Sequence, residues 1–190
     1  MFIKRKCLAF FLIAFLLIGC SRIVYTVAIH RDPILKPAIG SKTYALIVVS
    51  EDPFKKIVEK KILNLIRKSL NERGWREVLS EEAKYLFGVN FEIMSTQHVV
   101  SEGVSTYYDP EGKAHVSGGG GGSYTAFQRT VQVVAFSRDS EVVWTADCFS
   151  EGSTPDVFFA AKYMVPFAIK KFPEEGTWKK KKITSFTSFF

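Results

Sequence analysis

The chain has 190 residues, of which 47% are hydrophobic, and a formal net charge of +7. This length suits one domain that buries a core of its own without disulfides or metals. Residues 4–6 and the lysine run at 179–182 hold seven basic residues, which equals the whole excess of positive charge. Because the rest of the chain is neutral, the composition argues against nucleic-acid binding, which needs a basic surface on the folded body.

Residues 1–19 have the pattern of a secretory leader. Basic residues 4–6 precede the apolar run 8–18, which is shorter than the roughly 20 residues that a bilayer-spanning helix needs. The run ends in Leu17, Ile18, Gly19 and Cys20, which resembles the lipobox of bacterial lipoproteins. There a thiol forms the thioether to diacylglycerol, and a small preceding residue admits the peptidase. We predict cleavage before Cys20 and lipidation of its sulfur; the alternative is an uncleaved anchor with a chance cysteine.

A lipid on Cys20 implies where the protein works. Lipoproteins carry two or three acyl chains, which hold a protein stably where one chain holds it marginally. Ser21 follows the cysteine in place of the aspartate that favours retention at the inner membrane. We therefore expect a protein anchored in the cell outer membrane and facing the periplasm, with Cys148 as its one free thiol and no internal disulfide.

After the leader, residues 20–40 are predicted to form a lipidated tether, since a short alternating stretch is followed by Pro33 and Pro37. Residues 43–50 read as a strand. Asp52 and Pro53 then begin a helix, which Gly74 ends in a left-handed cap. Its apolar positions recur at helical spacing, while its polar side carries Lys55, Glu59, Lys60, Arg67 and Lys68.

The second half of the chain alternates as strands do at residues 85–95, 124–136 and 141–149, the last two joined as a hairpin. Thr154, Pro155 and Asp156 open a final helix, which Pro166 should kink. This order predicts an α+β fold: a two-layer domain with a mostly antiparallel sheet and two amphipathic helices packed on one face. The domain covers residues 41–175.

Residues 176–190 form a predicted basic and aromatic tail, with Trp178, four lysines and three phenylalanines. Such a composition is typical of contact with a membrane surface. A solvated tail, or a strand that pairs elsewhere, is the alternative.

Taken together, these segments resemble domain-of-unknown-function family 4136, a group of small bacterial envelope lipoproteins. The resemblance covers residues 20–173 and is carried by the lipobox, residues 42–49, the helix ending at 74–75, residues 83–91 and 142–144, and the helix ending at 172–173. The family has no established catalytic residues, so the resemblance implies none here. The glycine-rich insertion and the aromatic tail depart from the family pattern.

The loop at residues 101–123 is the best candidate for a recognition surface. It carries Tyr107, Tyr108 and His115, and long loops in compact domains are often binding elements, although a plain connection is the alternative. The glycine run 118–122 is not a phosphate-binding loop, since a strand and not a helix follows it.

No residues suggest catalysis, a cofactor or a metal. Cys148 alternates with Val142, Trp144 and Ala146, which predicts a buried structural thiol, and the three histidines lack the spacing of a zinc site. We therefore expect a lipid-anchored, non-catalytic envelope module that binds a protein, glycan or lipid partner. The alternatives are a carrier of an apolar ligand between helices and sheet, and a thiol-dependent enzyme that uses Cys148.

Overall fold

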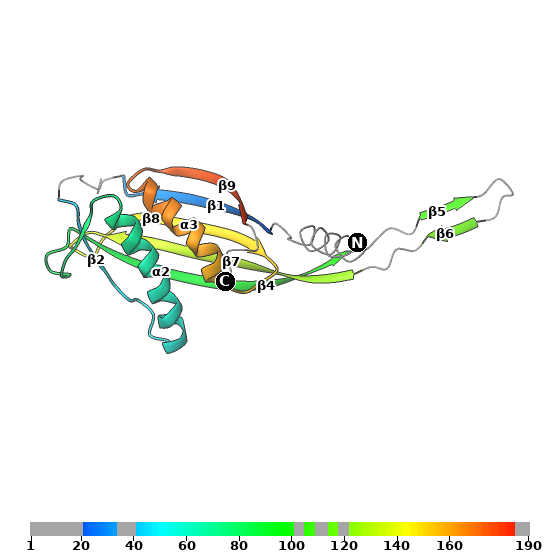
Figure 1. The fold of residues 1–190 in the computed structure, drawn as a ribbon, viewed down its shortest axis with the longest axis horizontal. Helices are drawn as coiled ribbons and strands as arrows, with labels where there is room; N and C mark the ends of the chain where they lie inside the picture. The colour runs from blue at the N-terminus through cyan, green and yellow to red at the C-terminus, as the bar shows by residue number, and fades with distance from the viewer. Residues whose placement is uncertain (1–20, 34–40, 101–104, 109–113, 118–121, 185–190) are drawn as a thin grey trace, which may run out of the picture.

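The computed structural model describes residues 21–33, 41–100, 105–108, 114–117 and 122–184. This part of the chain forms two helices and nine strands, seven of which lie in one sheet (Figure 1). In chain order the elements are β1 (Ser21–Arg31), β2 (Thr43–Leu46), α2 (Pro53–Asn71), β3 (Arg76–Glu77), β4 (Tyr85–Val100), β5 (Ser105–Tyr108), β6 (Ala114–Ser117), β7 (Gly122–Phe136), β8 (Val142–Gly152), α3 (Val157–Lys171) and β9 (Gly176–Thr184).

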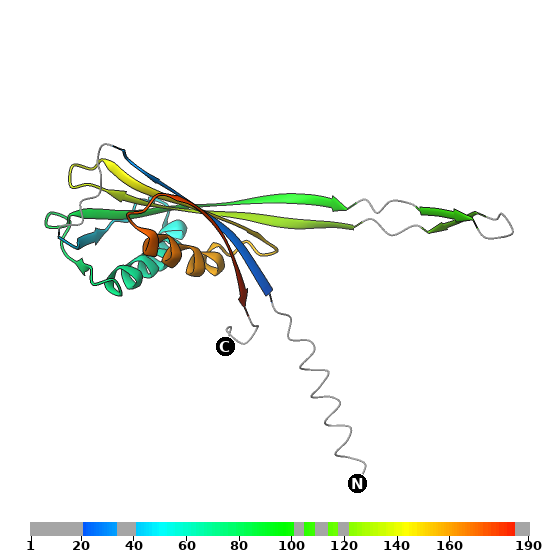
Figure 2. The same cartoon turned by 90° about the horizontal axis from the view of Figure 1, so that it is seen from above.

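The sheet has the strand order β3-β2-β4-β7-β8-β1-β9. Only β2 pairs in parallel, with β3 and with β4, and all other neighbours are antiparallel. Both helices cover the same face of the sheet (Figure 2). The predicted α+β architecture, with a mostly antiparallel sheet and two helices on one face, is confirmed.

Helix α2 begins and ends at the predicted signals. Asp52 accepts a hydrogen bond from the backbone N–H of Phe54 at 2.8 Å, and Pro53 occupies the first turn. Beyond the C-terminus Gly74 takes φ 75°, and Trp75 turns back into the core. Both local predictions are confirmed.

Helix α3 is mostly apolar and lies flat on the sheet. Asp156 caps its start, and the helix continues through Pro166. At its end the guanidinium of Arg73 donates to the backbone carbonyls of Ile169 and Phe172, the latter at 2.7 Å. Burial lowers the pKa of Arg73. This arginine therefore ties the ends of the two helices together.

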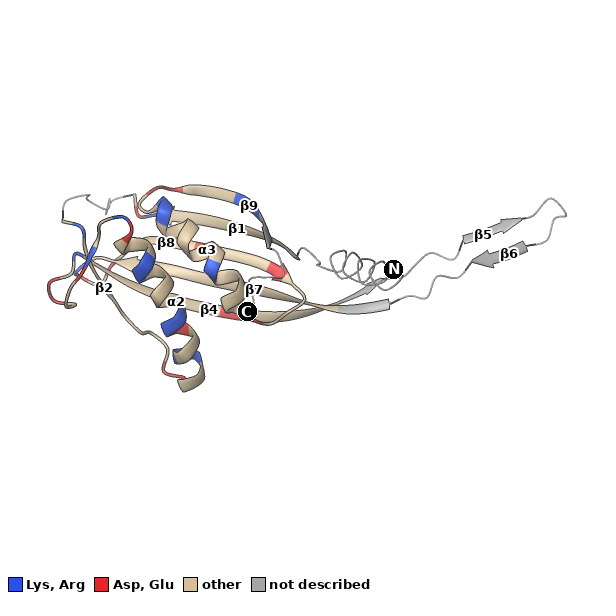
Figure 3. Cartoon of the chain, viewed as in Figure 1, with Lys and Arg blue, Asp and Glu red and all other residues tan. Residues whose placement is uncertain are grey.

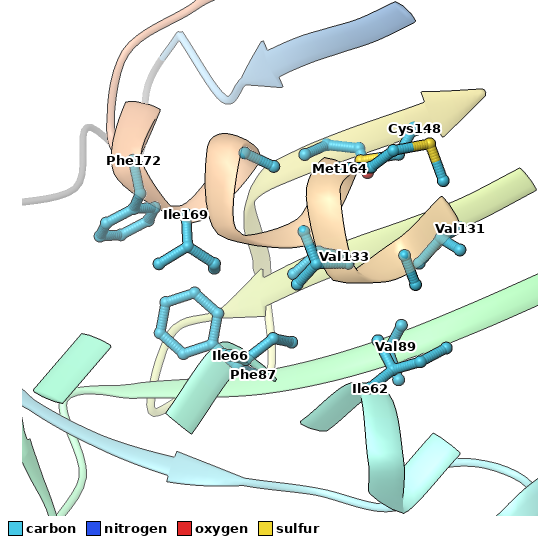
Figure 4. Packing of buried hydrophobic residues seen from close by; sticks show 14 of the residues in the cluster. Ile62, Ile66, Phe87, Val89, Val131, Val133, Cys148, Met164, Ile169 and Phe172 are labelled. Carbon is cyan, nitrogen blue, oxygen red and sulfur yellow. The ribbon is translucent and has the colours of Figure 1, made fainter. Parts of the chain in front are cut away.

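Phe172 joins the helix layer to the sheet. Its ring meets four aromatic rings edge to face, at centroid distances of 5.6 Å to Trp75, 5.6 Å to Tyr85, 5.4 Å to Phe87 and 5.2 Å to Trp144. Such pairs add about 0.5–1.5 kcal/mol each beyond the area they bury. Figure 4 shows Phe172 and Ile169 above this part of the sheet.

The predicted tether is wrong over residues 21–31. These residues form β1, an interior strand between β8 and β9. Ile23, Tyr25, Val27 and Ile29 are buried beneath the helices. The alternation of apolar and polar residues at these positions indicates a strand, but the two prolines that follow it favour a tether. The sheet therefore begins at Ser21.

The predicted tail is wrong over residues 176–184. These residues form β9, which pairs with β1 along its whole length, and the ring of Trp178 packs 6.2 Å from that of Phe167. Of the alternatives considered for this segment, strand pairing is the one observed. Residues 185–190 lie outside the described part of the chain.

Strands β4 and β7 are longer than predicted and pair as far as Val100 and Gly122. Both run past the ends of the other strands, and the small β5/β6 hairpin lies beyond them (Figure 2). The segment predicted as a loop at residues 101–123 therefore contains two further strands. Among the described helices, none has the length and apolar character needed to cross a bilayer.

Candidate partner-binding site

The residues predicted for recognition lie on the β5/β6 hairpin. Tyr107 stands opposite His115 and Tyr108 opposite Ala114, so the backbone register brings the three predicted residues to one end of the molecule. Cys20, the predicted lipidation site, lies outside the described residues.

A different surface has the form of a binding site. A groove of about 400 Å³ lies between strand β4 and the segment that leads from β2 into α2. It is lined by Val49, Ser50, Lys55, Glu59, Gly88, Val89, Asn90, Phe91, Gln132, Val134 and Phe136. Valine and phenylalanine side chains supply most of the apolar wall, and Lys55 supplies a cation.

The groove follows a free strand edge. The backbone N–H of Ile47 donates to the carbonyl of Phe87 at 3.0 Å, and beyond this point β4 has no described strand on that side. Because N–H and C=O groups alternate in direction along a strand, those of Val89, Phe91 and Ile93 also point outward. The outward N–H of Phe91 is satisfied by the side chain of Asn90, at 2.9 Å.

Glu59 fixes the segment after β2, which forms the wall of the groove opposite β4. Its carboxylate accepts the backbone N–H of Val49 at 2.6 Å and that of Ser50 at 3.1 Å, and the residue is 1% exposed. The prediction that placed Glu59 on the polar side of the helix is therefore wrong. A buried carboxylate needs such donors, and the backbone after β2 supplies them.

Gly88 lets this wall approach the sheet. A Cβ on Gly88 would lie 3.1 Å from Cγ2 of Val49 and 3.4 Å from Cγ1 of Ile47. The space is therefore closed to larger side chains unless the segment moves. Glycine at this position allows the chain after β2 to cross over β4 and form the groove.

The elements that line the groove also carry exposed apolar side chains. We call Val48, Val49, Phe54, Ile57, Ile93 and Met94 the edge patch; they are exposed by between 41% and 82%, Phe54 the most. In Figure 4, Ile66 lies beside Phe87 and Ile62 beside Val89, so α2 runs opposite to β4 and its first turns lie toward Ile93. Exposed apolar side chains on elements that border a groove are a feature of interaction surfaces.

The uncovered face of the sheet carries a short polar row. Gln132 donates from Nε2 to Oδ1 of Asp147 at 2.8 Å, and Nε2 of His30 lies 3.9 Å from Oδ2 of the same carboxylate. The side chains of His30 and Asp147 are 66% and 40% exposed. The row is therefore open to solvent.

Cys148 is inside the core. Its side chain is 0% exposed, and burial, with a smaller contribution from Asp147, raises the pKa of the thiol. The predicted structural thiol is confirmed, and this geometry gives no support to a thiol-dependent enzyme because the nucleophile would be the thiolate. No group of three or more potential ligands, counted over the described residues, could hold a metal ion.

Arg129 is a buried cation in the middle of β7. It is 2% exposed, and its Nε and Nη1 atoms, like the hydroxyl of the cross-strand neighbour Ser150, have no hydrogen-bond partner in the described structure. A Cβ on Gly152 would collide with Nη2, so glycine there admits the guanidinium. Burial lowers the pKa of Arg129.

Sequence reasoning missed the groove because its parts are far apart in the chain. Gly88 and Asn90 interrupt the apolar character of β4, and an isolated glycine in a strand often marks close approach of another backbone. Gly88 is such a signal. The burial of Glu59, in contrast, depends on where the segment after β2 turns, and no local pattern reveals it.

No protein-family profile matches the chain, and no curated protein matches it. Among solved structures the chain is similar to a PDZ domain protein from Parabacteroides distasonis, with 11% identity and a TM-score of 0.49 over 91% of this chain and 41% of that one. The chain thus spans about two-fifths of that protein. It is also similar to PelC from Paraburkholderia phytofirmans, solved as a dodecamer, with 15% identity and a TM-score of 0.40 over 75% of this chain and 94% of that one. A single-residue variant of PelC gives 14% identity, with 76% and 94% covered and the same TM-score of 0.40. These values carry no functional information about this chain.

Proposed function

We propose that this protein is a lipid-anchored, non-catalytic envelope module that binds an extended segment of a partner protein along the free edge of β4. One observation carries the proposal: the outward backbone groups of Val89, Phe91 and Ile93 lie between a groove and the edge patch. A guest strand would continue the line of β2, pair with these groups, replacing the Asn90 side chain at the N–H of Phe91, and place alternate side chains against the patch.

The two edges of the sheet differ in a way that favours this proposal. Exposed edges are usually blunted by lysine or proline, which discourage pairing. The terminal strand β9 has four lysines at residues 179–182, whereas residues 90–100 of β4 contain no lysine, arginine or proline. Of these two strands, β4 is therefore the more open to pairing with a further strand.

The anchor rests on the leader and on Cys20. The apolar run, the small residue before the cysteine and the resemblance to domain-of-unknown-function family 4136 all support export and lipidation. Replacing Cys20 with alanine should move the protein from the membrane fraction to the soluble fraction while the domain stays folded. A Cys20→Ala variant that fractionates fully with membranes would contradict lipidation as the anchor.

The edge can be tested in cells with a photo-crosslinker. Phe54 is 82% exposed at the start of α2 and precedes Lys55, which lines the groove, so p-benzoylphenylalanine at position 54 preserves the aromatic ring and is accessible to a partner. We expect a crosslinked species with the full-length protein. A probe at Lys61, which is exposed on the same helix, provides the background.

The role of the backbone is tested by a second change in the same probe-bearing protein. Ile93→Pro removes an outward N–H and leaves the ladder to β7 intact, because proline is tolerated on a free edge. It should abolish the crosslink, whereas Ile93→Ala, which keeps the N–H, should retain most of it. A crosslink that survives Ile93→Pro, or one with the mass of two copies of this chain, would contradict the proposal.

A second candidate function is a carrier of an apolar ligand, and one observation favours it. The groove volume of about 400 Å³ falls in the range of small-molecule pockets, and Val134 and Phe136 supply an apolar wall. Native mass spectrometry of the unlipidated protein should then show a retained small molecule. If the wild-type protein has the mass of the chain without a ligand, and the probe at position 54 crosslinks to a partner protein, the carrier function is rejected.

A further inference from the structure

The lipid and the sheet are separated by no linker. If Cys20 is acylated, as the proposed function holds, the next residue is Ser21, the first residue of β1, which pairs with Thr184 of β9. A strand rises about 3.3 Å per residue. The residues of β9 that face Ile23 and Thr26, Lys182 and Lys179, are therefore about 10 and 20 Å along the strand from the lipidated position.

Strand β9 brings a concentrated positive charge to this end. Four lysines, at residues 179–182, pair with residues 23–26 of β1, and neither strand contains aspartate or glutamate. In Figure 3 part of the β9 ribbon is blue, the colour of lysine and arginine. Lys179 and Lys181 are exposed on the uncovered face, while Lys180 lies over the ring of Phe167 at 5.4 Å on the helix face.

Three of these lysines carry charge that the described part of the chain does not neutralise. Across the described residues, no carboxylate stands within ion-pair distance of Lys179, Lys180 or Lys181. The acidic residue nearest in register is Glu151, one position beyond the Tyr25–Ser150 pair on the neighbouring strand β8. The charge is thus available to a ligand outside the chain.

Protection of an edge strand is the competing explanation. Charged side chains on an exposed edge discourage pairing with other sheets. That role is served by like charges of either sign, since repulsion between copies is what blocks pairing. Contact with an anionic surface, in contrast, needs positive charge, so the two explanations differ in their dependence on sign.

We propose that β9, together with the start of β1, forms a basic surface that lies on the anionic headgroups of the anchoring membrane. The inference rests on the proposed function for the anchor. It also orients the protein: β7, β8 and β1 separate the free edge of β4 from β9, so the proposed partner site faces away from the bilayer. The lipid anchors the protein in the membrane, and the lysines set the orientation of the domain relative to the bilayer.

The test uses the mature chain from position 20 with Cys20→Ser, so that no acyl group contributes; the described fold begins at Ser21 and is retained. Binding is measured by sedimentation with phosphatidylcholine vesicles with and without phosphatidylglycerol. The unlipidated protein should bind the anionic vesicles and lose binding in high salt. Equal sedimentation with both vesicle types would overturn the proposal.

Charge variants identify the surface. Changing residues 179–182 to glutamine should weaken binding at least about tenfold, since each basic residue near an anionic surface contributes severalfold. Changing them to arginine should preserve binding, and changing them to glutamate should abolish it. The matched control changes Lys55, Lys56, Lys60 and Lys61 to glutamine. It removes the same amount of charge from α2, which packs near β4 and not near β9, and should leave vesicle binding intact.

Two results would reject the basic surface on β9: equal loss in the α2 control, or binding retained by the glutamate variant. Should the quadruple glutamine variant fail to fold, Lys179 and Lys181 changed alone, on the uncovered face, give the same comparison. The anchor is judged separately by fractionation of the Cys20→Ala protein. If the native protein is lipidated but the unlipidated chain does not bind anionic vesicles, only the basic surface on β9 is refuted.

Discussion

Replacing Glu59 tests the physical origin of the groove. In Glu59→Leu, the amides of Val49 and Ser50 lose their acceptor, and each buried donor left without a partner costs about 1–3 kcal/mol. Relief from burying a carboxylate, and partial hydration of the freed amides, offset some of that cost. We expect a net loss of about 2–4 kcal/mol in the free energy of unfolding.

For a domain of this size, 1 kcal/mol shifts the melting temperature by about 2–4 °C, so Glu59→Leu should melt roughly 5–15 °C below wild type in a calorimetric or circular-dichroism scan. Glu59→Gln keeps one acceptor oxygen and should lose about half as much. Lys60→Leu, at an exposed neighbouring position, is the control and should change the free energy of unfolding by less than about 0.5 kcal/mol. A Glu59→Leu protein as stable as the control would refute the structural role given to this carboxylate.

Three further predictions concern the rest of the fold. Arg129→Met removes a buried, partly unpartnered cation and should leave the midpoint of urea unfolding unchanged or raised; a lower midpoint would mean that the guanidinium has partners in solution. Cys148 should react with a thiol reagent only when the protein is unfolded by denaturant, because it is buried and its pKa is raised, and rapid labelling of the native state would contradict that burial. The pKa of Glu77 is lowered by the hydrogen bonds that Arg67 donates at 2.7 and 2.9 Å, so the pair stabilises the fold above the ordinary glutamate pKa and this stability is lost as pH falls through the lowered value. Urea unfolding at neutral and acidic pH should therefore show a smaller loss on acidification in Glu77→Gln than in wild type, and identical losses would count against the pair.

The parts of the fold that sequence predicts well are those with local causes. Asp52 and Gly74 bound α2 because a capping carboxylate and a left-handed glycine act within one turn of the chain. The alternation in β4, β7 and β8 likewise reports a sheet with one buried face. From such signals the number of helices, the hairpin and the two-layer class follow.

The parts that sequence missed depend on long-range pairing. Residues 21–31 and 176–184 lie at opposite ends of the described chain and become strands because they pair with each other and with β8. Residues 21–31 follow a lipobox-like motif and resemble a tether when read alone. Residues 176–184 contain a lysine run and resemble a tail. The groove is non-local for the same reason, since Glu59 and Gly88 acquire their roles only when the segment after β2 passes between them.

The proposed lipid would be attached to the residue before the first strand, and the mass of the native N-terminal peptide tests this most directly. Protein purified from membranes in detergent should begin at Cys20 and carry the added mass of a diacylglyceryl group, with or without a further acyl chain on its amine. A peptide that begins at Met1, or one that begins at position 20 with an unmodified thiol, would contradict the account.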